Sequence, residues 1–335
     1  MLDALSQLSL FSAKAMILVI LILVLIAGIL SLFSRGKHQT KLSIKNLNSN
    51  YQDIKKEFLH EMLSKKSFKK YIKENKQEEK TKKTDADTDA KKNIFILTFD
   101  GDIKASAVNS LREEVTAILN VATEKDEVLI RLESPGGMVH AYGLAAAQLS
   151  RIREKGISLI ISVDKVAASG GYLMACIANK ILAAPFAIIG SIGVIVQLPN
   201  FHRLLKEKKV DFEQITAGNF KRTLTLFGEN TESGREKLHE EIEEIHSLFK
   251  NVIVEHRPQI DIDKVATGEH WLAKQAIELK LIDELRTSDD YLLEQSTKAN
   301  LFEIHYKIKK TFSEKLLTNV HALKATVFGS YSAPF

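Results

Sequence analysis

The chain has 335 residues, of which 45% are hydrophobic and 27% charged, and its formal net charge is +5. Its one cysteine, Cys176, excludes a disulfide within the chain, and no cluster of Cys and His has the spacing of metal ligands. The sequence also lacks a phosphate-binding loop and a dinucleotide-binding motif, so we expect no cofactor and no metal. The composition fits a globular α/β protein with one large domain or two modest ones.

A run of 19 uncharged, mostly apolar residues occupies positions 15–33, after a short N-terminal segment 1–14. A helix of this length spans roughly 28 Å, about the thickness of a bilayer core. A cleaved signal peptide would have a shorter apolar core and a more basic start. The run therefore predicts one transmembrane helix that anchors the chain in a lipid bilayer.

Residues 34–92 are predicted to form a basic tether. Positions 35–92 hold 17 Lys or Arg and 9 Asp or Glu, which leaves the rest of the chain with a net charge of −3. These cations lie beside a membrane segment and lack the interleaving with Gly and aromatic residues that is typical of nucleic-acid binding. They therefore favour anionic lipid head groups over nucleic acid as a partner. The first half has apolar residues at helical spacing (Tyr51, Ile54, Phe58 and Met62), whereas Lys73–Lys92 is predicted to be disordered.

Charges that flank the apolar run indicate its orientation. Four cations follow it closely, at Arg35, Lys37, Lys41 and Lys45, whereas Lys14 and the amino terminus precede it. The positive-inside rule then places the C-terminal part in the cytoplasm.

Residues 93–285 alternate between apolar runs and helical patterns, which predicts an α/β domain of layered β-β-α or β-α units. The expected strands are 94–99, 127–132, 157–163, 180–184, 192–196 and 212–216. The expected helices are 108–121, 138–155, the segment after Ser169, a long helix from Thr231 with a capping box at Ser233, and 267–285. The remaining segment, 286–335, has the patterns of a strand at 301–309 and an amphipathic helix at 316–327, where we expect oligomer contacts.

Ser169 stands where an apolar strand turns into a helix, followed by Gly170 and Gly171. A serine at such a turn can present its hydroxyl outside the sheet, and the N–H groups of the helix start can stabilise negative charge on an attacked carbonyl. The alternative is a serine that only caps the helix. The motif therefore marks Ser169 as a candidate nucleophile.

A serine nucleophile needs a base that accepts its proton. None of the ten histidines has an Asp at a spacing typical of a triad, and Tyr172 occupies the position that a Ser-x-x-Lys motif would require to be lysine. Two lysines remain, Lys165 in the turn before Ser169 and Lys221 in a later loop, and either could also be an ordinary surface lysine. A lysine base must be kept uncharged by apolar surroundings, which Phe220, Leu224 and a bound substrate could supply.

Four motifs occur together in chain order: Ser134-Pro135-Gly136-Gly137, Ala167-Ala168-Ser169-Gly170-Gly171-Tyr172, Gly190-Ser191-Ile192-Gly193-Val194, and the string from Lys221 to Asn230. In this set, which covers about residues 93–285, the chain resembles the Ser–Lys signal-peptide-peptidase family. With the N-terminal anchor and the basic tether, it is most similar to the inner-membrane, SohB-type branch of that family.

The resemblance implies the fold of the Clp protease and the crotonases, with stacked β-β-α units. It implies Ser169 as nucleophile, Lys221 as general base, and an oxyanion hole of the Gly170 N–H with an N–H of Gly137 or Gly136. Ser191 falls where a family hydroxyl orients the lysine, or is a turn serine. Glu133 departs from the asparagine of related peptidases, so no role is carried over to it.

These expectations describe a membrane-anchored serine endopeptidase that acts through an acyl-enzyme on membrane-derived or signal-peptide-like peptides, as a homo-oligomer, in the bacterial inner membrane. The family analogy allows a periplasmic catalytic domain, against the cytoplasmic orientation that the flanking charges favour. The alternatives are a crotonase-like enzyme that acts on acyl thioesters, which share the oxyanion architecture, and a non-catalytic membrane scaffold.

Overall fold

The computed structural model describes residues 41–84 and 91–307, together with positions 14, 16–19, 21, 22 and 25. The few described positions within 15–33 are helical, but most of the expected membrane helix lies outside the described residues, as does the helix expected at 316–327. Among the helices that the described residues form, none combines the length and the apolar character needed to cross a membrane.

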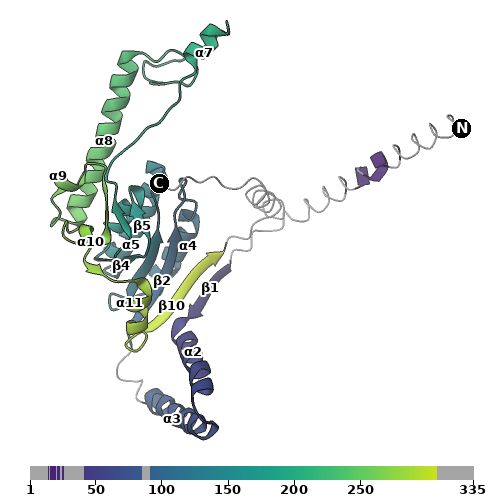
Figure 1. Ribbon diagram of the computed structural model, residues 1–335, viewed down its shortest axis with the longest axis vertical. Coiled ribbons are helices and arrows are strands. Elements are labelled where there is room, and N and C mark those ends of the chain that lie inside the picture. The colour runs from purple at the N-terminus through teal and green to yellow at the C-terminus, as the bar shows by residue number, and fades with distance from the viewer. Residues whose placement is uncertain are drawn as a thin grey trace, which may run out of the picture. The chain divides into compact units, whose positions relative to one another are not determined.

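A parallel sheet forms the centre of the fold (Figure 1). The strands lie in the order β1-β10-β2-β3-β4-β6-β9, and each pairing from β10 to β9 is parallel. Their bounds are β1 Lys41–Asn46, β2 Asn93–Asp100, β3 Glu127–Glu133, β4 Ser158–Val163, β6 Lys180–Ala183, β9 Glu284–Leu285 and β10 Asn300–Lys307. The central strands are continuous apolar runs because both of their faces are covered. The strand expected at 301–309 is thus a member of this sheet, whereas β1 was not predicted from the sequence.

A second, smaller sheet stands beside the first, in the order β5-β7-β8. Its strands are β5 Val166–Ala168, β7 Ile188–Gly190 and β8 His270–Leu272, and a bridge from Ser134 to Ala167 extends it. Successive stretches of chain therefore place one strand in each sheet before a helix follows, as in β4-β5-α6, where α6 is Gly170–Ala175. This arrangement confirms the predicted α/β class with stacked β-β-α units.

Helices cover the two faces of the main sheet. On one face α4 (Val108–Leu119) and α5 (Val139–Glu154) pack against β2 and β4. On the other face a buried cluster joins the N-terminal end of α2 (Leu47–Met62) and α11 (Ser288–Gln295) to the strands, through Leu47, Ile96, Leu129, Tyr291 and Leu292.

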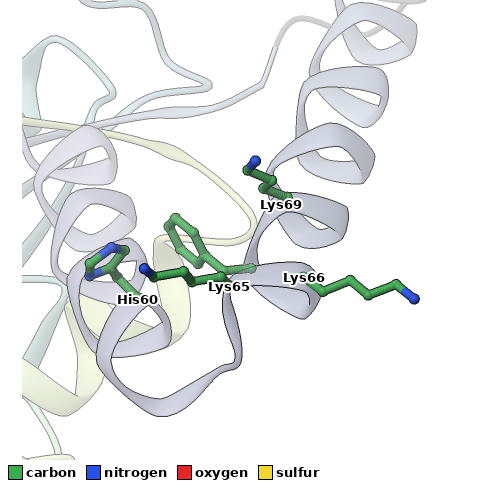
Figure 2. A pocket seen from close by; sticks show the side chains of 5 residues that line it. His60, Lys65, Lys66 and Lys69 are labelled. Atoms are coloured by element: carbon green, nitrogen blue, oxygen red, sulfur yellow. The ribbon is translucent and has the colours of Figure 1, made fainter.

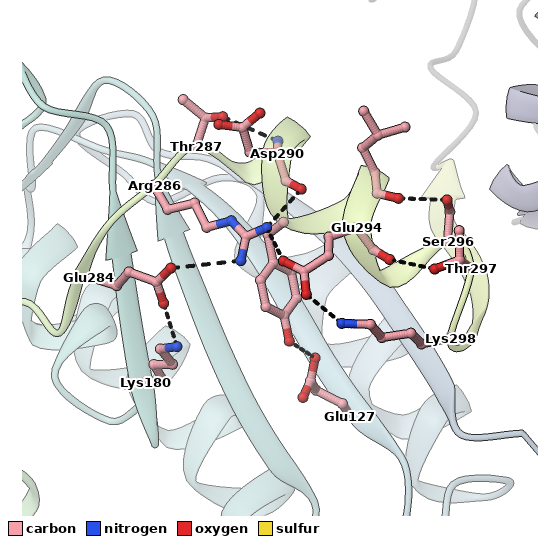
Figure 3. A network of polar contacts seen from close by, with 12 residues as sticks. Glu127, Lys180, Glu284, Arg286, Thr287, Asp290, Glu294, Ser296, Thr297 and Lys298 are labelled. Carbon is pink, nitrogen blue, oxygen red and sulfur yellow. Dashed lines mark hydrogen bonds and ion pairs between the residues drawn. The ribbon is translucent and has the colours of Figure 1, made fainter.

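A polar network holds α11 against the sheet (Figure 3). The Tyr291 hydroxyl donates to Glu127 Oε1 of β3 at 2.7 Å, and burial raises the pKa of Tyr291. Glu294 accepts from Lys298 and from Arg286, and these hydrogen bonds lower the pKa of its carboxyl to about 2. Arg286 in turn contacts Glu284 of β9, so the network links the helix to both halves of the sheet.

The tether contains more regular structure than its composition suggests. The helix expected around Tyr51 is α2, and α3 (Lys65–Thr84) follows it after a short break. The disorder expected from Lys73 onward is therefore wrong as far as Thr84. Lys, Glu and Gln are good helix formers, the stretch has no Gly or Pro, and Lys70 pairs with Glu74 one turn later.

The chain between β7 and the long helix α8 (Glu232–His256) differs most from expectation. Neither 192–196 nor 212–216 forms a strand, and the one regular element there is the short α7 (His202–Glu207). Figure 1 shows α7 beyond the N-terminal end of α8, away from the sheets. The cap of α8 is Thr231, whose side chain accepts from the Gly234 N–H, and not Ser233.

The helix expected at 267–285 is also wrong. That stretch contains β8, the short helix α10 (Ala273–Ala276) and β9, because its apolar residues supply edge strands to both sheets. The C-terminal end of α8 is fixed by its C-cap residue, the buried Arg257, which forms a bidentate pair with Asp283 at 2.7 and 2.9 Å. The short helix α9 (Ile262–Val265) follows Arg257.

Candidate active site

Ser169 lies at the junction of β5 and α6 in a strained backbone conformation, with φ 52° and ψ −121°. Its N–H donates to the Gly190 carbonyl at 2.8 Å, and its own carbonyl accepts from the Leu173 N–H at 3.0 Å. A non-glycine residue with such angles costs about 1–3 kcal/mol and persists only where its surroundings hold it on both sides. The strained turn is what directs the side chain of Ser169 out of the sheet.

The Ser169 hydroxyl has no hydrogen-bond partner among the described residues. Ser169 occupies the N-cap position of α6, but its side chain makes no capping hydrogen bond. The alternative in which Ser169 serves only as a helix cap is therefore wrong, because its Oγ does not engage the backbone N–H groups that a cap would satisfy.

An apolar cavity of about 230 Å³ opens onto Ser169. Loops from both sheets and the C-terminal half of α8 enclose it, and its lining includes Val139, Leu173, Val194, Ile195, Ile245, Leu248, Phe249 and Val252. No charged side chain and no histidine lines it. Such a cavity suits an apolar or small side chain of a ligand.

The loop of Gly136 and Gly137 lies against Ser169. A Cβ added to Gly136, which has φ +91°, would stand 2.7 Å from the Ser169 Cβ, and one added to Gly137 would collide with the Ile103 backbone. Glycine is therefore required for this close approach.

Two backbone N–H groups beside Ser169 are free to bind an anion. The N–H groups of Gly137 and Gly170 donate to no other group in the described part of the chain, and both residues line the cavity. The Gly136 N–H instead donates to Ser134 Oγ at 3.1 Å. The Gly136 N–H is thus engaged within the loop, whereas the N–H groups of Gly137 and Gly170 are unpartnered. The formation of an oxyanion hole by these glycines stays a prediction.

Lys221 does not belong to the lining of the cavity at Ser169, and no contact between the two residues is found among the described residues. Its side chain is exposed, and its N–H donates to Gly218 O at 3.2 Å in a turn. The neighbouring Phe220 ring lies under Lys237 Nζ at 5.8 Å, near the N-terminal end of α8, whereas the cavity meets α8 from Ile245 onward. Lys237 and Ile245 are about 12 Å apart along the helix axis at 1.5 Å per residue.

Ser191 lies near the nucleophile in the adjacent strand connection. It follows Gly190, whose carbonyl holds the Ser169 N–H, and has a positive φ of 53°. Its N–H donates to Glu269 O at 2.6 Å, and its hydroxyl has no partner among the described residues. The role of Ser191 in orienting a lysine stays a prediction.

Two other potentially reactive side chains, Lys165 and Cys176, are held in their protonated forms. Lys165 pairs with Glu133 at 2.9 Å, and its hydrogen bond to that carboxylate raises the pKa of its amine, the opposite of what a base requires. Cys176 is fully buried, and burial raises the pKa of its thiol to about 12. Within the described ranges no three His, Cys, Asp or Glu side chains gather as metal ligands would.

A second surface hollow lies on the α2–α3 hairpin (Figure 2). It is lined by His60, Lys65, Lys66, Phe68 and Lys69, and Figure 2 shows lysine side chains extending from the first turns of α3. The lining combines cations with a single aromatic ring and contains no serine and no carboxylate. It therefore has neither the nucleophile nor the backbone donors found at Ser169.

Sequence reasoning gave no role to two residues at this site: Ser134, which it named only as part of a motif, and Tyr142, which it did not name. Both are fully buried beneath the glycine loop and hydrogen-bonded to each other at 2.6 Å. The sequence offers a signal for Ser134, because it is a polar residue between an apolar strand and Pro-Gly-Gly. It offers no such signal for Tyr142, whose position matches an ordinary apolar position of α5.

Comparisons with known proteins show which family the chain belongs to. Two protein-family sequence models match the chain. That of the N-terminal part of peptidase family S49 matches residues 3–149, and that of peptidase family S49 matches residues 151–301. A probable protease SohB of Haemophilus influenzae is 47% identical over 98% of this chain and 97% of its own length. A probable protease SohB of Buchnera aphidicola is 49% identical over 95% of both chains.

Solved structures are more distant. A substrate-bound mutant of the 1510-N membrane-bound stomatin-specific protease is 15% identical, covers 70% of this chain and 99% of its own, and has a TM-score of 0.44. A ClpP1 mutant of Listeria monocytogenes is 14% identical, covers 63% and 99%, and has a TM-score of 0.38. By its sequence relatives, the chain belongs to peptidase family S49, a family of serine peptidases, and is of the SohB type.

Proposed function

We propose that this peptidase is a serine endopeptidase with Ser169 as nucleophile and Lys221 as general base. The observation that carries the proposal is the strained, unpartnered Ser169, which faces an apolar cavity beside the free N–H groups of Gly137 and Gly170. A stacked β-β-α architecture supports a fold of the Clp-protease and crotonase type.

The proposed reaction has two steps. Ser169 Oγ attacks the peptide carbonyl carbon while its proton passes to the neutral amine of Lys221, and the carbonyl oxygen takes up negative charge between the Gly137 and Gly170 N–H groups. The C–N bond then breaks, and the Lys221 ammonium returns the proton to the leaving amine. In the second step water attacks the ester, Lys221 accepts a proton from this water, and Ser169 leaves with that proton.

A second copy of the chain would supply Lys221. Residues 191–231 carry many exposed apolar side chains, among them Val210, Ile215 and Phe220. Exposed apolar surface of this extent is typical of a protein interface. Docking this arm (residues 191–231) on a neighbouring copy would bury these residues and give the lysine the apolar surroundings that a base needs.

The substrate and the location follow from the cavity and the N-terminal run. The apolar lining favours peptides with small or hydrophobic side chains, such as those derived from membrane segments or signal peptides. We infer a single-pass anchor at residues 15–33 in the bacterial inner membrane, with the side of the catalytic domain open between cytoplasm and periplasm.

Mixing two inactive variants tests both the dyad and its origin. Ser169→Ala and Lys221→Ala should each abolish peptide hydrolysis, and Ser169→Ala should also abolish labelling by a fluorophosphonate probe. If neighbouring copies share the site, mixed oligomers of the two variants recover activity, at about one quarter of the sites in a random equimolar ring.

Three outcomes would contradict the proposal. Full hydrolysis by either single variant would show that Ser169 and Lys221 do not form a catalytic dyad. If verified mixed oligomers do not recover activity, the site is not shared between neighbouring copies. Turnover of an acyl thioester by a wild-type chain that the probe does not label would favour a crotonase-like enzyme instead.

A further inference from the structure

A buried chain of hydrogen bonds runs beneath the glycine loop that lies against Ser169. It joins the Gly136 N–H, the Ser134 hydroxyl, the Tyr142 hydroxyl and the Asp102 carbonyl, with lengths of 3.1, 2.6 and 2.9 Å. Ser134 and Tyr142 are both 0% exposed. The four groups come from three separate parts of the chain: the loop after β2, the loop after β3 and the first turn of α5.

The direction of the protons in this chain is determined by its two ends. A backbone N–H can only donate and a carbonyl oxygen can only accept. The Gly136 N–H therefore donates to Ser134 Oγ, and the Tyr142 hydroxyl donates to the Asp102 carbonyl. The one proton left for the 2.6 Å contact is that of Ser134, which donates to the Tyr142 oxygen. Both hydroxyls are thus satisfied, and neither can rotate without leaving a buried group unpaired.

The ring of Tyr142 contacts the other half of the site. A Cβ added to Gly170 would lie 2.5 Å from Tyr142 Cγ, so the start of α6 rests directly on this ring. The ring also meets the Phe99 ring edge-on, at 6.4 Å between centroids. The Tyr142 ring therefore contacts Gly170 directly. Its hydroxyl is linked to the glycine loop through Ser134, which accepts a hydrogen bond from the Gly136 N–H.

We propose that Ser134 and Tyr142 are positioning residues that fix the Gly137 N–H relative to the Gly170 N–H. This inference rests on the proposed function. Both N–H groups must point at one oxygen as charge develops on it, so their separation matters more in the transition state than in substrate binding. Neither hydroxyl faces the reacting atoms, and each acts through the loop that it holds.

The test compares Tyr142→Phe with Tyr291→Phe in the full chain. Both variants lose a buried, hydrogen-bonded tyrosine hydroxyl. The Tyr142 hydroxyl bonds Ser134 and Asp102, whereas the Tyr291 hydroxyl bonds Glu127, which is not among the residues around Ser169. We expect Tyr142→Phe to lower kcat on a quenched fluorogenic peptide about tenfold with KM within about twofold, and to slow fluorophosphonate labelling equally. Tyr291→Phe should leave both rates unchanged, and the melting temperatures of the two variants should agree within about 4 °C.

Ser134→Ala provides the second variant. Because the two hydroxyls form one chain, the double variant Ser134→Ala/Tyr142→Phe should be no slower than the worse single variant. Multiplied losses in the double variant, or a Tyr142→Phe enzyme with wild-type kcat, overturn the inference. If the probe does not label the wild-type chain, the proposed function is overturned, and the inference with it. If the probe labels the wild type and Tyr142→Phe has unchanged kcat and labelling rate, the inference alone is overturned.

Discussion

At the scale of single residues, the site depends on backbone conformations that few residues adopt. Ser169 has a positive φ, and Gly136 and Gly190, which flank it in space, have φ values of +91° and +108°. A Cβ at Gly190 would meet the Trp271 ring at 2.8 Å, just as one at Gly136 would meet Ser169. These glycines allow three strand connections to converge on one side chain.

Gly136→Ala should therefore abolish activity without unfolding the protein. The added methyl group must displace either the glycine loop or Ser169, and a misplacement of about 1 Å lowers kcat by roughly 100-fold. Gly156→Ala is the matched control, since Gly156 has φ +77° but its Cβ would meet only the flexible Glu124 side chain. Both variants should lose more than about 1 kcal/mol in urea unfolding because alanine disfavours a positive φ, and Gly136→Ala should lose the larger amount because of its additional clash. Wild-type kcat in Gly136→Ala would show that the loop is not held against the serine.

At the scale of secondary-structure elements, the two halves of α8 contact different parts of the molecule. Its first turns contact the segment of Lys221 through Gly234 and Lys237. Its later turns close the cavity, and its end is anchored to α5, where Arg153 Nη1 contacts His256 Nδ1 at 3.0 Å. The sequence predicted one amphipathic helix, because periodicity reports that a face is buried and not which partner buries it.

The anchored end of α8 should weaken on acidification. Burial, and then the charge of Arg153, lower the pKa of His256 below its ordinary value of 6.5, while Glu255 opposes this shift. The unfolded chain then binds the proton more readily, so this contribution to stability is present above pH 6.5 and is lost as the pH falls below it. Urea unfolding at pH 7.5 and 5.5 should show a smaller loss of stability in His256→Gln than in the wild type. An equal loss in both proteins would contradict this assignment.

At the scale of the whole molecule, the proposed assembly depends on the exposed apolar side chains of the arm. Ile215 is 96% exposed and Val210 51%, while Phe201 and Phe212 both pack against Phe227 within the arm. The aromatic contacts give the arm a shape of its own, and the exposed aliphatic residues are left for a partner.

Ile215→Asp should disrupt the assembly and the activity together. A charge placed in an apolar interface opposes association, because it must lose its water without gaining a partner. Sedimentation velocity of the full chain in detergent should show smaller particles than the wild type, with loss of hydrolysis. Val121→Asp is the control, since Val121 is exposed in the turn after α4, and it should change neither property. A monomeric wild type with full activity would contradict the shared site.

The sequence by itself determined the alternation of strands and helices, the turn at Ser169, the glycine loop and the membership in the family. These depend on local periodicity, on backbone conformations that only certain residues adopt, and on contiguous motifs. Only the tertiary structure decided that the segment of Lys221 contacts the first turns of α8, that the later turns of α8 close the cavity, and that Ser134 and Tyr142 meet beneath the glycine loop. The segment of Lys221 has no regular period, and its place depends on contacts between residues far apart in the chain, which no local pattern records.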